Sequence, residues 1–597
     1  MTAPIADYAM LSDCRTAALV SADGSVDWLC LPRYDSASVF GALLGDDDHG
    51  HWTLRPTDAA ATATREYEDG TFVLTTRWES AEGVVEVRDF MPIDGGRVDL
   101  VRRIVGISGS VEMTSLLRLR FDYARALPWV RQVGSDDQPG LLAVAGPDAV
   151  LVRGAAFVAR DHLHEATVVV RAGETRDLTL TWFASHLDTP GPLDVDGALA
   201  QTRSWWRAWS DRIEHDGPFE EHVVRSLLVL RALTHEDTGG IVAAATTSLP
   251  EDFGGSRNWD YRYVWLRDAA LTIEALISHG FLGVTARWRD WLLRAIAGDP
   301  EQLQIMYGIA GERDLTEREL DSLPGYEGST PVRIGNGAFT QYQGDVIGEV
   351  MIALEAARNA GLEETPLSWA LQRALLGYAE RYRDHADNGI WEIRGEPHLF
   401  THSRVMIWAA FERGVRAARE YGLPGPVERW EELRDLMRAE IEERGFDTER
   451  GHFVQHYDTT EVDASLLLLA QVGFVAHDDP RMQGTVAEME RTLMHDGLLH
   501  RYRAATGIDG LEGGEHPFLA CSFWLVEQYA GSGRVSDART LMERLCGIAN
   551  DVGLLSEEYD VTGRRHAGNT PQALSHLALV RAADALSGHH GRAAERT

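Results

Sequence analysis

The sequence is poor in cysteine and has no long apolar run. Its 597 residues include only four cysteines, with no CxxC pair and no His/Cys cluster at metal-ligand spacing, so neither a disulfide framework nor a zinc site is indicated. No run of 18 apolar residues occurs, and the first residues lack a basic segment followed by an apolar one. The sequence therefore predicts neither a transmembrane helix nor a secretory signal. We expect a protein of the cytoplasm.

Basic residues are scarce relative to acidic ones. The chain has 57 Lys and Arg against 92 Asp and Glu, a formal net charge of −35. Such a surface repels the phosphates of nucleic acids and of anionic lipids. A neutral ligand such as a sugar meets no such penalty, although an acidic surface is equally typical of a highly soluble or salt-adapted protein. We expect no nucleic-acid partner and no membrane partner.

Motifs for metal ions and for phosphates are also missing. The chain has no EF-hand loop, no HExxH motif and no P-loop. We therefore predict no cofactor and no metal ion in the reaction itself. A structural cation and a dependence on phosphate or magnesium stay open, as does the oligomeric state, a homodimer included.

The length and composition of the chain predict a fully folded protein of more than one domain. Hydrophobic residues make up 44% and charged residues 25%, which is typical of globular proteins, and 597 residues exceed one hydrophobic core. Up to about residue 205 the pattern is of short alternating segments separated by Gly and Asp, which predicts an antiparallel β-sandwich. The clearest of these segments are 72–78, 83–90, 101–107, 165–171 and 177–182.

From residue 220 onward the hydrophobic period becomes helical. Alternate connections between the helical segments are short and the longer loops precede every second helix, so we expect six antiparallel helix pairs. Six pairs predict an (α/α)6 toroid, whereas a helical solenoid would show a sequence repeat, and we find none.

The predicted domains are a sandwich at 1–205, a linker at 206–219 and a helical domain at 220–597. With boundaries good to about 2–4 residues, the twelve helices are placed at 220–236, 260–280, 285–297, 344–361, 364–384, 401–422, 427–447, 463–475, 480–494, 516–533, 534–551 and 570–588.

Aromatic, arginine and carboxylate residues gather in the loops that enter the inner helices. In a closed toroid these loops meet at one end, so residues far apart in sequence share a cleft. Such side chains stack on the apolar faces of sugars and bind neighbouring hydroxyls in pairs. Singly, each of them is also compatible with a structural ion pair, a helix cap or a packing residue. The candidates are Trp259, Tyr261, Trp265, Arg267, Asp268, Gln341, Trp391, Glu392, Glu515, His516 and Glu557.

Two of these residues, Glu392 and Glu557, each lie beside an aromatic residue shortly before a helix. Cleavage of a glycosidic bond needs one protonated carboxyl for the leaving oxygen and one ionised carboxylate that acts on water or on the anomeric carbon. Taken alone, each Glu is more typical of a solvated residue or of a charge favoured by the helix dipole. Their place on a common rim favours the acid and base pair.

With these residues identified, the helical region resembles the catalytic domain of family 15 glycoside hydrolases, the glucoamylase and bacterial trehalase group. The segment 265–268 is similar to the family's substrate-binding Trp-x-Arg-Asp, 391–392 to its general-acid segment, 501–502 to its second sugar-binding arginine and 556–560 to its general-base segment, in the same order. The opening 35 residues are similar to the prokaryotic branch that carries an N-terminal β-sandwich. The resemblance covers nearly the whole chain.

The resemblance implies a role for each carboxyl. Glu392 would protonate the glycosidic oxygen and Glu557 would activate water on the opposite face of the ring, which inverts the anomeric centre and releases β-D-glucose. We expect a raised pKa for Glu392, which Trp391 partly desolvates, and an ionised Glu557. Ile393 and the pair Pro517 and Phe518 depart from the fungal glucoamylase pattern, so the subsites beyond the cleaved bond stay open.

The resemblance also implies a set of substrate-binding residues. Tyr8 and Asp35 are a further expectation: a sandwich loop would reach across the toroid mouth, close the pocket and help to position water. The alternative is that Asp35 ends a turn and Tyr8 packs at the domain interface. With the residues of the loops that enter the inner helices included, the predicted substrate-binding residues are Arg267, Asp268, Trp259, Tyr261, Trp265, Trp391, Arg501, Glu515, His516 and Gln341.

The predicted function is that of an inverting, exo-acting α-glucoside hydrolase that releases β-D-glucose from a small neutral substrate. Trehalose is favoured, with isomaltose and other α-1,6-glucosides or short maltooligosaccharides close behind. One alternative is a sugar phosphorylase of similar architecture, which would need a basic phosphate pocket where Glu557 lies. The other is a carbohydrate-binding protein without activity, which would be expected to lack one of the two carboxylates.

Overall fold

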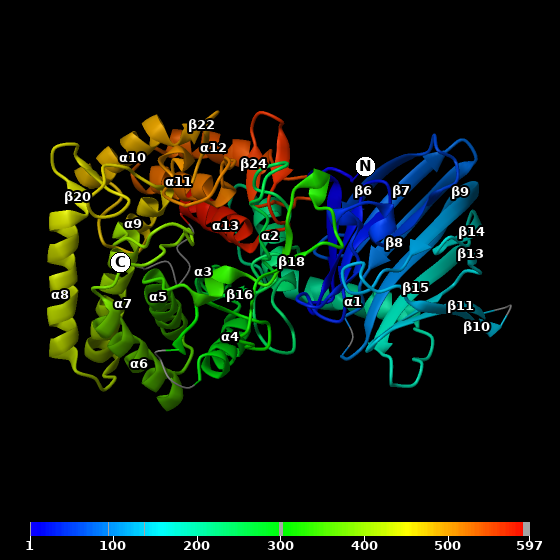
Figure 1. Ribbon diagram of the computed structural model, residues 1–597, viewed down its shortest axis with the longest axis horizontal. Helices are drawn as coiled ribbons and strands as arrows, with labels where there is room; N and C mark the ends of the chain where they lie inside the picture. Colours follow the sequence, from blue (N-terminus) through cyan, green and yellow to red (C-terminus); the bar gives the residue numbers. More distant parts are fainter. Residues whose placement is uncertain (1, 94, 136–137, 216, 298–301, 589–597) are drawn as a thin grey trace.

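The chain forms a sheet domain and a helical domain that lie side by side (Figure 1). The computed structural model describes residues 2–93, 95–135, 138–215, 217–297 and 302–588. Within these ranges no helix has the length and apolar character needed to cross a membrane.

The N-terminal domain consists of antiparallel strands. Short apolar segments that alternate with polar residues, as in β7 and β8, place one face of each strand in the core. In the described residues of this domain the strands are β1 (Tyr8–Ser12), β2 (Ala17–Ser21), β3 (Ser25–Cys30), β4 (Ser38–Phe40), β5 (His51–Pro56), β6 (Thr62–Tyr67), β7 (Leu74–Ser80), β8 (Gly83–Phe90), β9 (Val98–Arg118), β10 (Trp129–Ser135), β11 (Gln138–Ala145), β12 (Asp148–Arg153), β13 (Val158–Arg160), β14 (Leu163–Arg171) and β15 (Thr175–Ala184).

The long strand β9 belongs to two sheets. Its first half pairs with β8 and β15, and its second half pairs with β5 and β14. Arg102 on β9 joins the two layers, because its buried guanidinium binds Asp89 of β8 at 2.9 Å and donates to the carbonyl of Trp52 on β5 at 2.6 Å. The predicted antiparallel sandwich is confirmed.

A helix that the sequence did not predict, α1 (Val195–Ser210), joins the domains. Asp194 caps its first turn by accepting a hydrogen bond from the Gly197 amide. Trp206 packs edge-on against Phe72 of the sheet domain, with ring centroids 5.0 Å apart. Trp209 stacks on Phe281 of the helical domain at 4.1 Å. The division at residue 205 stays a prediction, and that boundary falls inside α1.

Twelve further helices follow in the described part of the chain. The eighth is shorter than predicted, because residues 464–467 form a 3-10 turn before the α-helix begins. The second begins at residue 266 rather than 260, since Val264 and Trp265 pair with Met306 and Tyr307 as a short ladder, β16 with β17. The helices are α2 (Glu220–Ala232), α3 (Leu266–Ser278), α4 (Leu282–Ala295), α5 (Asp345–Asn359), α6 (Pro366–Tyr382), α7 (Thr401–Tyr421), α8 (Val427–Arg444), α9 (Leu468–Gln471), α10 (Pro480–Thr492), α11 (Leu519–Gly531), α12 (Val535–Cys546) and α13 (Ala573–Ser587).

Short strand pairs occur in the loops between these helices. They hold the loops in fixed shapes at the ends of the helical domain. The pairs are β16 (Val264–Trp265) with β17 (Met306–Tyr307), β18 (Arg318–Leu320) with β19 (Val332–Ile334), β20 (Phe446–Asp447) with β21 (His452–Phe453), β22 (Met494–His495) with β23 (Leu498–Leu499), and β24 (Glu558–Asp560) with β25 (Arg565–Ala567).

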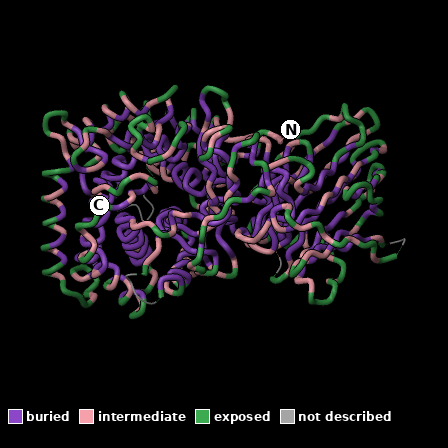
Figure 2. Tube along the Cα trace, viewed as in Figure 1, coloured by how far each residue is buried: buried purple, intermediate pink, exposed green. Residues whose placement is uncertain are grey.

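Every second helix belongs to a closed inner ring. Helix α3 packs against α5, α5 against α7, α7 against the 464–471 segment, that segment against α11, α11 against α13, and α13 back against α3. Inner helices are apolar around most of their circumference: residues 266–277 of α3 are all buried. The outer helix α8 buries only Trp430, Leu433, Met437 and Ile441, one stripe at helical spacing. Figure 2 shows this contrast, and the predicted (α/α)6 toroid is confirmed.

The sheet domain supports the loop that enters α3. Arg262 in this loop is fully buried, pairs with Asp260 at 2.7 Å, and donates to the Ser36 carbonyl and the Tyr123 hydroxyl of the sheet domain, both at 2.9 Å. Trp28 on β3 donates to the Ala245 carbonyl at 3.0 Å. These contacts fix the backbone that carries the first group of predicted site residues.

Candidate active site

One pocket of roughly 780 Å³, its open mouth included, lies where the loops entering the inner helices meet. The loops before α3, α5, α7, α11 and α13 all contribute to its wall. Most of the predicted site residues therefore come together although they span some 300 positions of sequence. Those that line the pocket are Trp259, Tyr261, Trp265, Arg267, Asp268, Trp391, Glu392, Arg501 and Glu557.

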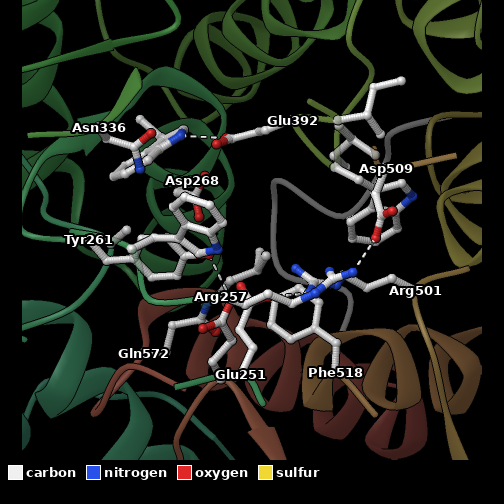
Figure 3. A pocket seen from close by; sticks show the side chains of 18 of the residues that line it. Glu251, Arg257, Tyr261, Asp268, Asn336, Glu392, Arg501, Asp509, Phe518 and Gln572 are labelled. Carbon is white, nitrogen blue, oxygen red and sulfur yellow. Dashed lines mark hydrogen bonds and ion pairs between the residues drawn. The ribbon is translucent and has the colours of Figure 1, made fainter. Parts of the chain in front are cut away.

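Glu392 enters the pocket from a tight turn before α7. Its backbone is left-handed, with φ of 57°, a conformation that non-glycine residues rarely adopt. Its amide donates to the Gly389 carbonyl at 3.1 Å, and Gln341 holds the turn from behind by donating to the carbonyls of Glu392 and Ile393, both at 3.2 Å. Strained backbone of this kind persists only where its surroundings fix it. In Figure 3 the Glu392 side chain projects into the pocket.

The carboxyl of Glu392 lies between an indole and a guanidinium. Trp265 donates its indole N–H to Oε1 at 2.6 Å, and Nη2 of Arg267 is 3.5 Å from the same oxygen. Arg267 is itself held by Asp268 at 2.9 Å and by the Ile390 carbonyl at 2.9 Å. Burial raises the pKa of Glu392, while Arg267 and the indole hydrogen bond oppose the rise. The expected direction of this pKa is confirmed.

Glu557 approaches the pocket from the loop before α13. The hydroxyl of Tyr261 donates to its Oε1 at 2.8 Å, and the amide of Asn569 lies 3.4 Å from its Oε2. The residue is 1% exposed. Gly568 faces it with φ of 72°, and a Cβ on that glycine would lie only 2.6 Å from Oε2, so the close approach requires glycine.

Behind Glu557 lies a buried cluster of carboxyls around Arg501. Nη2 of Arg501 binds Glu515 at 2.8 Å, Glu558 at 2.9 Å and Glu251 at 3.0 Å. Oxygens of Glu251, Glu557 and Glu558 all lie within 4.8 Å of one another. One guanidinium therefore faces more carboxyls than it can neutralise, so protons are retained among them.

This cluster changes the expected charge of Glu557. Burial, with Glu251 second, raises its pKa to about 8, against the opposing effects of Arg501 and of the Tyr261 hydrogen bond. The expectation of an ionised Glu557 at neutral pH is therefore not met. No sequence pattern indicated this, because burial and the nearby charge of Glu251, which is far away in the chain, arise only in the folded protein.

Aromatic side chains form the remaining wall. Trp259 is covered by two guanidinium groups, those of Arg333 at 4.5 Å and Arg394 at 4.8 Å from its ring. The rings of Tyr261 and Trp265 meet edge to face at 5.5 Å. Trp391 donates its indole N–H to Asp463 at 2.9 Å, which fixes the ring next to Glu392. These rings offer the apolar faces that sugar binding uses.

Three predicted substrate-binding residues support the pocket and do not line it. Gln341 holds the Glu392 turn, as described above. Glu515 is buried against Arg501. The amide of His516 donates to Glu558 at 3.0 Å, and its ring lies 3.9 Å from Asp560. The expectation that these three contact substrate is not met in this pocket.

The expectation that Tyr8 and Asp35 close the pocket is wrong, since neither side chain lines it. The Tyr8 hydroxyl donates to Asp27 at 2.8 Å inside the sheet domain. Asp35 pairs with Arg33 at 2.8 Å and lies 3.4 Å from the Ile309 amide at the domain interface. Asp35 therefore contacts the domain interface, and the Tyr8 hydroxyl is bound within the sheet domain.

Several lining residues were not predicted. Arg257, fully buried, binds Asp509 at 2.5 Å, and it directly precedes the aromatic segment that begins at Asn258, so extending that segment would have found it. Glu251 lies after a proline in a turn with no distinguishing pattern. The polar lining residues missed from sequence are Glu251, Arg257, Asn336, Arg394, Asp509 and Gln572.

Residues 217–584 match the family described as Glycosyl hydrolases family 15. The chain belongs to this family. Residues 1–180 match a second family, described as Trehalase-like, N-terminal. The family 15 match confirms the predicted resemblance to family 15 glycoside hydrolases. The protein is therefore a glycoside hydrolase.

Relatives of family 15 match almost the full length. The chain is 36% identical over 613 residues to "Trehalase" of Mycobacterium tuberculosis, covering 97% of this chain and 89% of that one. It is 36% identical to "Trehalase" of Mycolicibacterium smegmatis, with 97% and 90% covered. A bacterial glucoamylase solved in complex with acarbose superposes with a TM-score of 0.74 at 13% identity, covering 99% and 95%, which supports the fold alone.

Proposed function

We propose that this family 15 enzyme hydrolyses trehalose, with Glu392 as general acid, Glu557 as general base and inversion at the anomeric carbon. The observation that carries the proposal is a pair of buried carboxyls on separate loops of one pocket, each held by its own donor, Trp265 or Tyr261. The substrate is supported by relatives named "Trehalase" that match nearly the whole chain.

The proposed reaction is a single displacement. Glu392 gives its proton to the glycosidic oxygen as the bond to the anomeric carbon breaks. Water adds to the opposite face of that carbon and gives its proton to Glu557. The products are two glucose molecules: the attacked ring becomes β, and the departing ring keeps its α configuration. Burial raises the pKa of Glu392, which is the direction that favours the protonated acid in the first step.

The proposed base must lose a proton before it can act. Because the pKa of Glu557 is raised to about 8, the fraction of free enzyme with an ionised base grows between pH 6 and pH 9. Because kcat/KM follows the ionisation of the free enzyme, its pH profile reports this ionisation of Glu557 together with that of the proposed acid, Glu392.

Arg267 and Asp268 are proposed to bind hydroxyls of the glucose ring that is attacked. Both line the pocket, and their mutual 2.9 Å contact presents the guanidinium and the carboxylate side by side beside Glu392. Paired donors and acceptors of this kind suit two neighbouring hydroxyls. Trp259, Tyr261, Trp265 and Trp391 are proposed to contact the apolar faces of the sugar.

The experiment is an NMR time course of trehalose, isomaltose and maltose with the wild type and with Glu557→Gln. From trehalose, inversion gives equal initial amounts of α- and β-glucose, and retention gives α-glucose alone. The variant is expected to lose at least ~10²-fold in kcat. Glu543→Gln, on the exposed face of α12, is the matched control.

Each alternative has its own outcome in this experiment. Cleavage of isomaltose or maltose but not of trehalose would identify a glucoamylase-like enzyme. Sugar phosphate formed only when phosphate is added would identify a phosphorylase, against which the acidic cluster around Glu557 argues, because it repels phosphate. Binding of sugar without any cleavage would leave a carbohydrate-binding protein.

We also propose that the enzyme acts in the cytoplasm on this small neutral substrate. Its four cysteines, Cys14, Cys30, Cys521 and Cys546, are free and buried, and burial raises the pKa of each thiol. Free thiols fit a reducing compartment. Activity of fractionated source cells, found in the cytoplasmic or in the external fraction, tests this placement.

A further inference from the structure

A second group of convergent polar side chains lies far from the pocket, at the other end of the inner ring. His215 precedes α2, His279 follows the last turn of α3, and Asp584 lies in the last turn of α13. One nitrogen from each histidine and one oxygen of the aspartate all lie within 4.8 Å of one another. We call these three residues the His–Asp cluster.

The cluster is remote from the reaction. Helices α3 and α13 both begin beside pocket residues, Asp268 and Leu574, and both end at the cluster. A helix of 13 residues, such as α3, is roughly 20 Å long at 1.5 Å per residue. The cluster therefore has no part in binding substrate or in the proposed proton transfers.

Backbone acceptors select the tautomer of each histidine. Nδ1 of His279 lies 3.0 Å from the carbonyl of Ala275, and Nε2 of His215 lies 3.4 Å from that of Pro218. A carbonyl oxygen only accepts, so these ring nitrogens carry the hydrogen. In the neutral rings, the nitrogens that face Asp584, Nε2 of His279 and Nδ1 of His215, therefore hold lone pairs. This is the arrangement by which proteins orient histidines toward metal ions.

The spacing inside the cluster fits the ligand shell of a metal ion. Oδ1 of Asp584 is 3.5 Å from Nδ1 of His215 and 3.4 Å from Nε2 of His279. Around Zn²⁺, ligand bonds of about 2.0–2.2 Å in a tetrahedron place neighbouring ligand atoms roughly 3.3–3.6 Å apart.

We propose that His215, His279 and Asp584 bind one Zn²⁺ ion. Two imidazoles and one carboxylate are a ligand set that suits zinc, and the fourth position would be taken by water. The side chain of Asp584 keeps 13% exposure, which gives the ion a route from solvent, while those of both histidines are almost fully buried.

The position of the ion suggests what it does. Helices α3 and α13 are the neighbours that close the inner ring, and His215 belongs to the segment that leads from α1 to α2. A zinc ion here ties the closing contact of the toroid to the connection between the domains. It is a structural ion, so its removal is expected to lower the melting temperature and to leave the proposed reaction chemistry in place.

The test is a zinc titration of the full-length, EDTA-treated protein in competition with a chromophoric chelator. We expect one Zn²⁺ per chain with sub-micromolar affinity. His279→Gln and Asp584→Asn should each weaken binding at least about 100-fold, since even residues that only orient a ligand cost 10- to 100-fold. His495→Gln, at an exposed histidine, is the matched control and should bind zinc as the wild type does.

A spectroscopic measurement on the wild type keeps the proposal testable if a variant fails to fold. X-ray absorption at the zinc edge should show two nitrogen ligands at about 2.0–2.1 Å together with oxygen ligands. Absence of stoichiometric zinc binding would overturn the proposal and leave an ion pair in which Asp584 raises the pKa of His215. Binding that the cluster variants do not weaken would also overturn it, by placing the ion elsewhere.

Discussion

The hydroxyl of Tyr261 donates a hydrogen bond of 2.8 Å to Oε1 of Glu557. Four residues later in the same loop, Trp265 donates to Glu392 at 2.6 Å, and the two aromatic rings meet edge to face at 5.5 Å. One short segment therefore holds both of the carboxyls that we propose as base and acid. Arg262, between these two residues, anchors the segment to the sheet domain, so the sandwich takes part in setting the geometry of the pocket.

Loss of the Tyr261 hydroxyl should raise the pKa of Glu557, because its hydrogen bond favours the ionised carboxylate. In Tyr261→Phe we expect the acidic limb of the kcat/KM profile on trehalose to move to higher pH. Hydrogen bonds to charged groups contribute about 1.5–3 kcal/mol, so activity at pH 7 should fall at least about tenfold. Tyr421→Phe, at an exposed tyrosine, is the control. An unmoved acidic limb would show that Glu557 does not govern it.

The indole N–H of Trp265 affects the pKa of Glu392 in the same direction as Tyr261 affects that of Glu557. Its hydrogen bond lowers the pKa of Glu392, although burial raises that pKa overall. Trp265→Phe keeps an aromatic ring and removes the donor, so the pKa of Glu392 should rise further. We expect the alkaline limb of the profile to move to higher pH while kcat falls. A limb that moves to lower pH would contradict Glu392 as the general acid.

Glu251, which is buried next to Glu557, raises the pKa of this proposed base. Its carboxylate is the second cause, after burial, of the raised pKa of Glu557. The other groups that face Glu557 are Arg501 and Tyr261, which lower its pKa, and Glu558, which lies within 4.8 Å of it. In Glu251→Gln the acidic limb should therefore move to lower pH, and the ratio of activity at pH 6 to that at pH 8 should rise.

The matched control for that change is Glu512→Gln, an exposed residue in the loop before α11. It alters the net charge by the same amount at the surface, where water screens it. An equal shift in both variants would mean that only the net charge matters. A shift in Glu251→Gln alone would identify the buried contact as the cause.

The fold could be predicted from the sequence because the hydrophobic residues recur at a clear helical period in helices that pack against neighbours on two sides. It predicted twelve helices, and the described residues contain them. Helix α1 was missed, since the predicted sandwich domain at 1–205 and linker at 206–219 divide it between two regions without a helix. The short eighth helix was overestimated because residues 464–475 are mostly apolar, and apolar runs do not reveal where a helix ends.

The site was predictable where its residues occur in dense local segments, and not elsewhere. Glu392 and Glu557 each lie beside an aromatic residue, and Trp265, Arg267 and Asp268 are nearly consecutive. Glu251 reaches the site only through the closure of the ring, which no local pattern records. The left-handed backbone of Glu392 and the pKa of Glu557 depend on tertiary contacts as well.

The raised pKa of Glu557 has a consequence for stability. Its ordinary value is 4.5, and in the fold it is about 8, so between these pH values the folded protein keeps a proton that the unfolded chain releases. The stabilising contribution is fully present below pH 4.5 and is lost as the pH rises to 8. Glutamine resembles the protonated carboxyl and does not titrate. Glu557→Gln should therefore raise the melting temperature relative to the wild type by an amount that grows from pH 5 to pH 8 and is constant above it. Scanning calorimetry at several pH values, with Glu543→Gln as the exposed control, measures this difference, and a gain that is the same at pH 5 and pH 8 would show that Glu557 is already ionised in the folded protein.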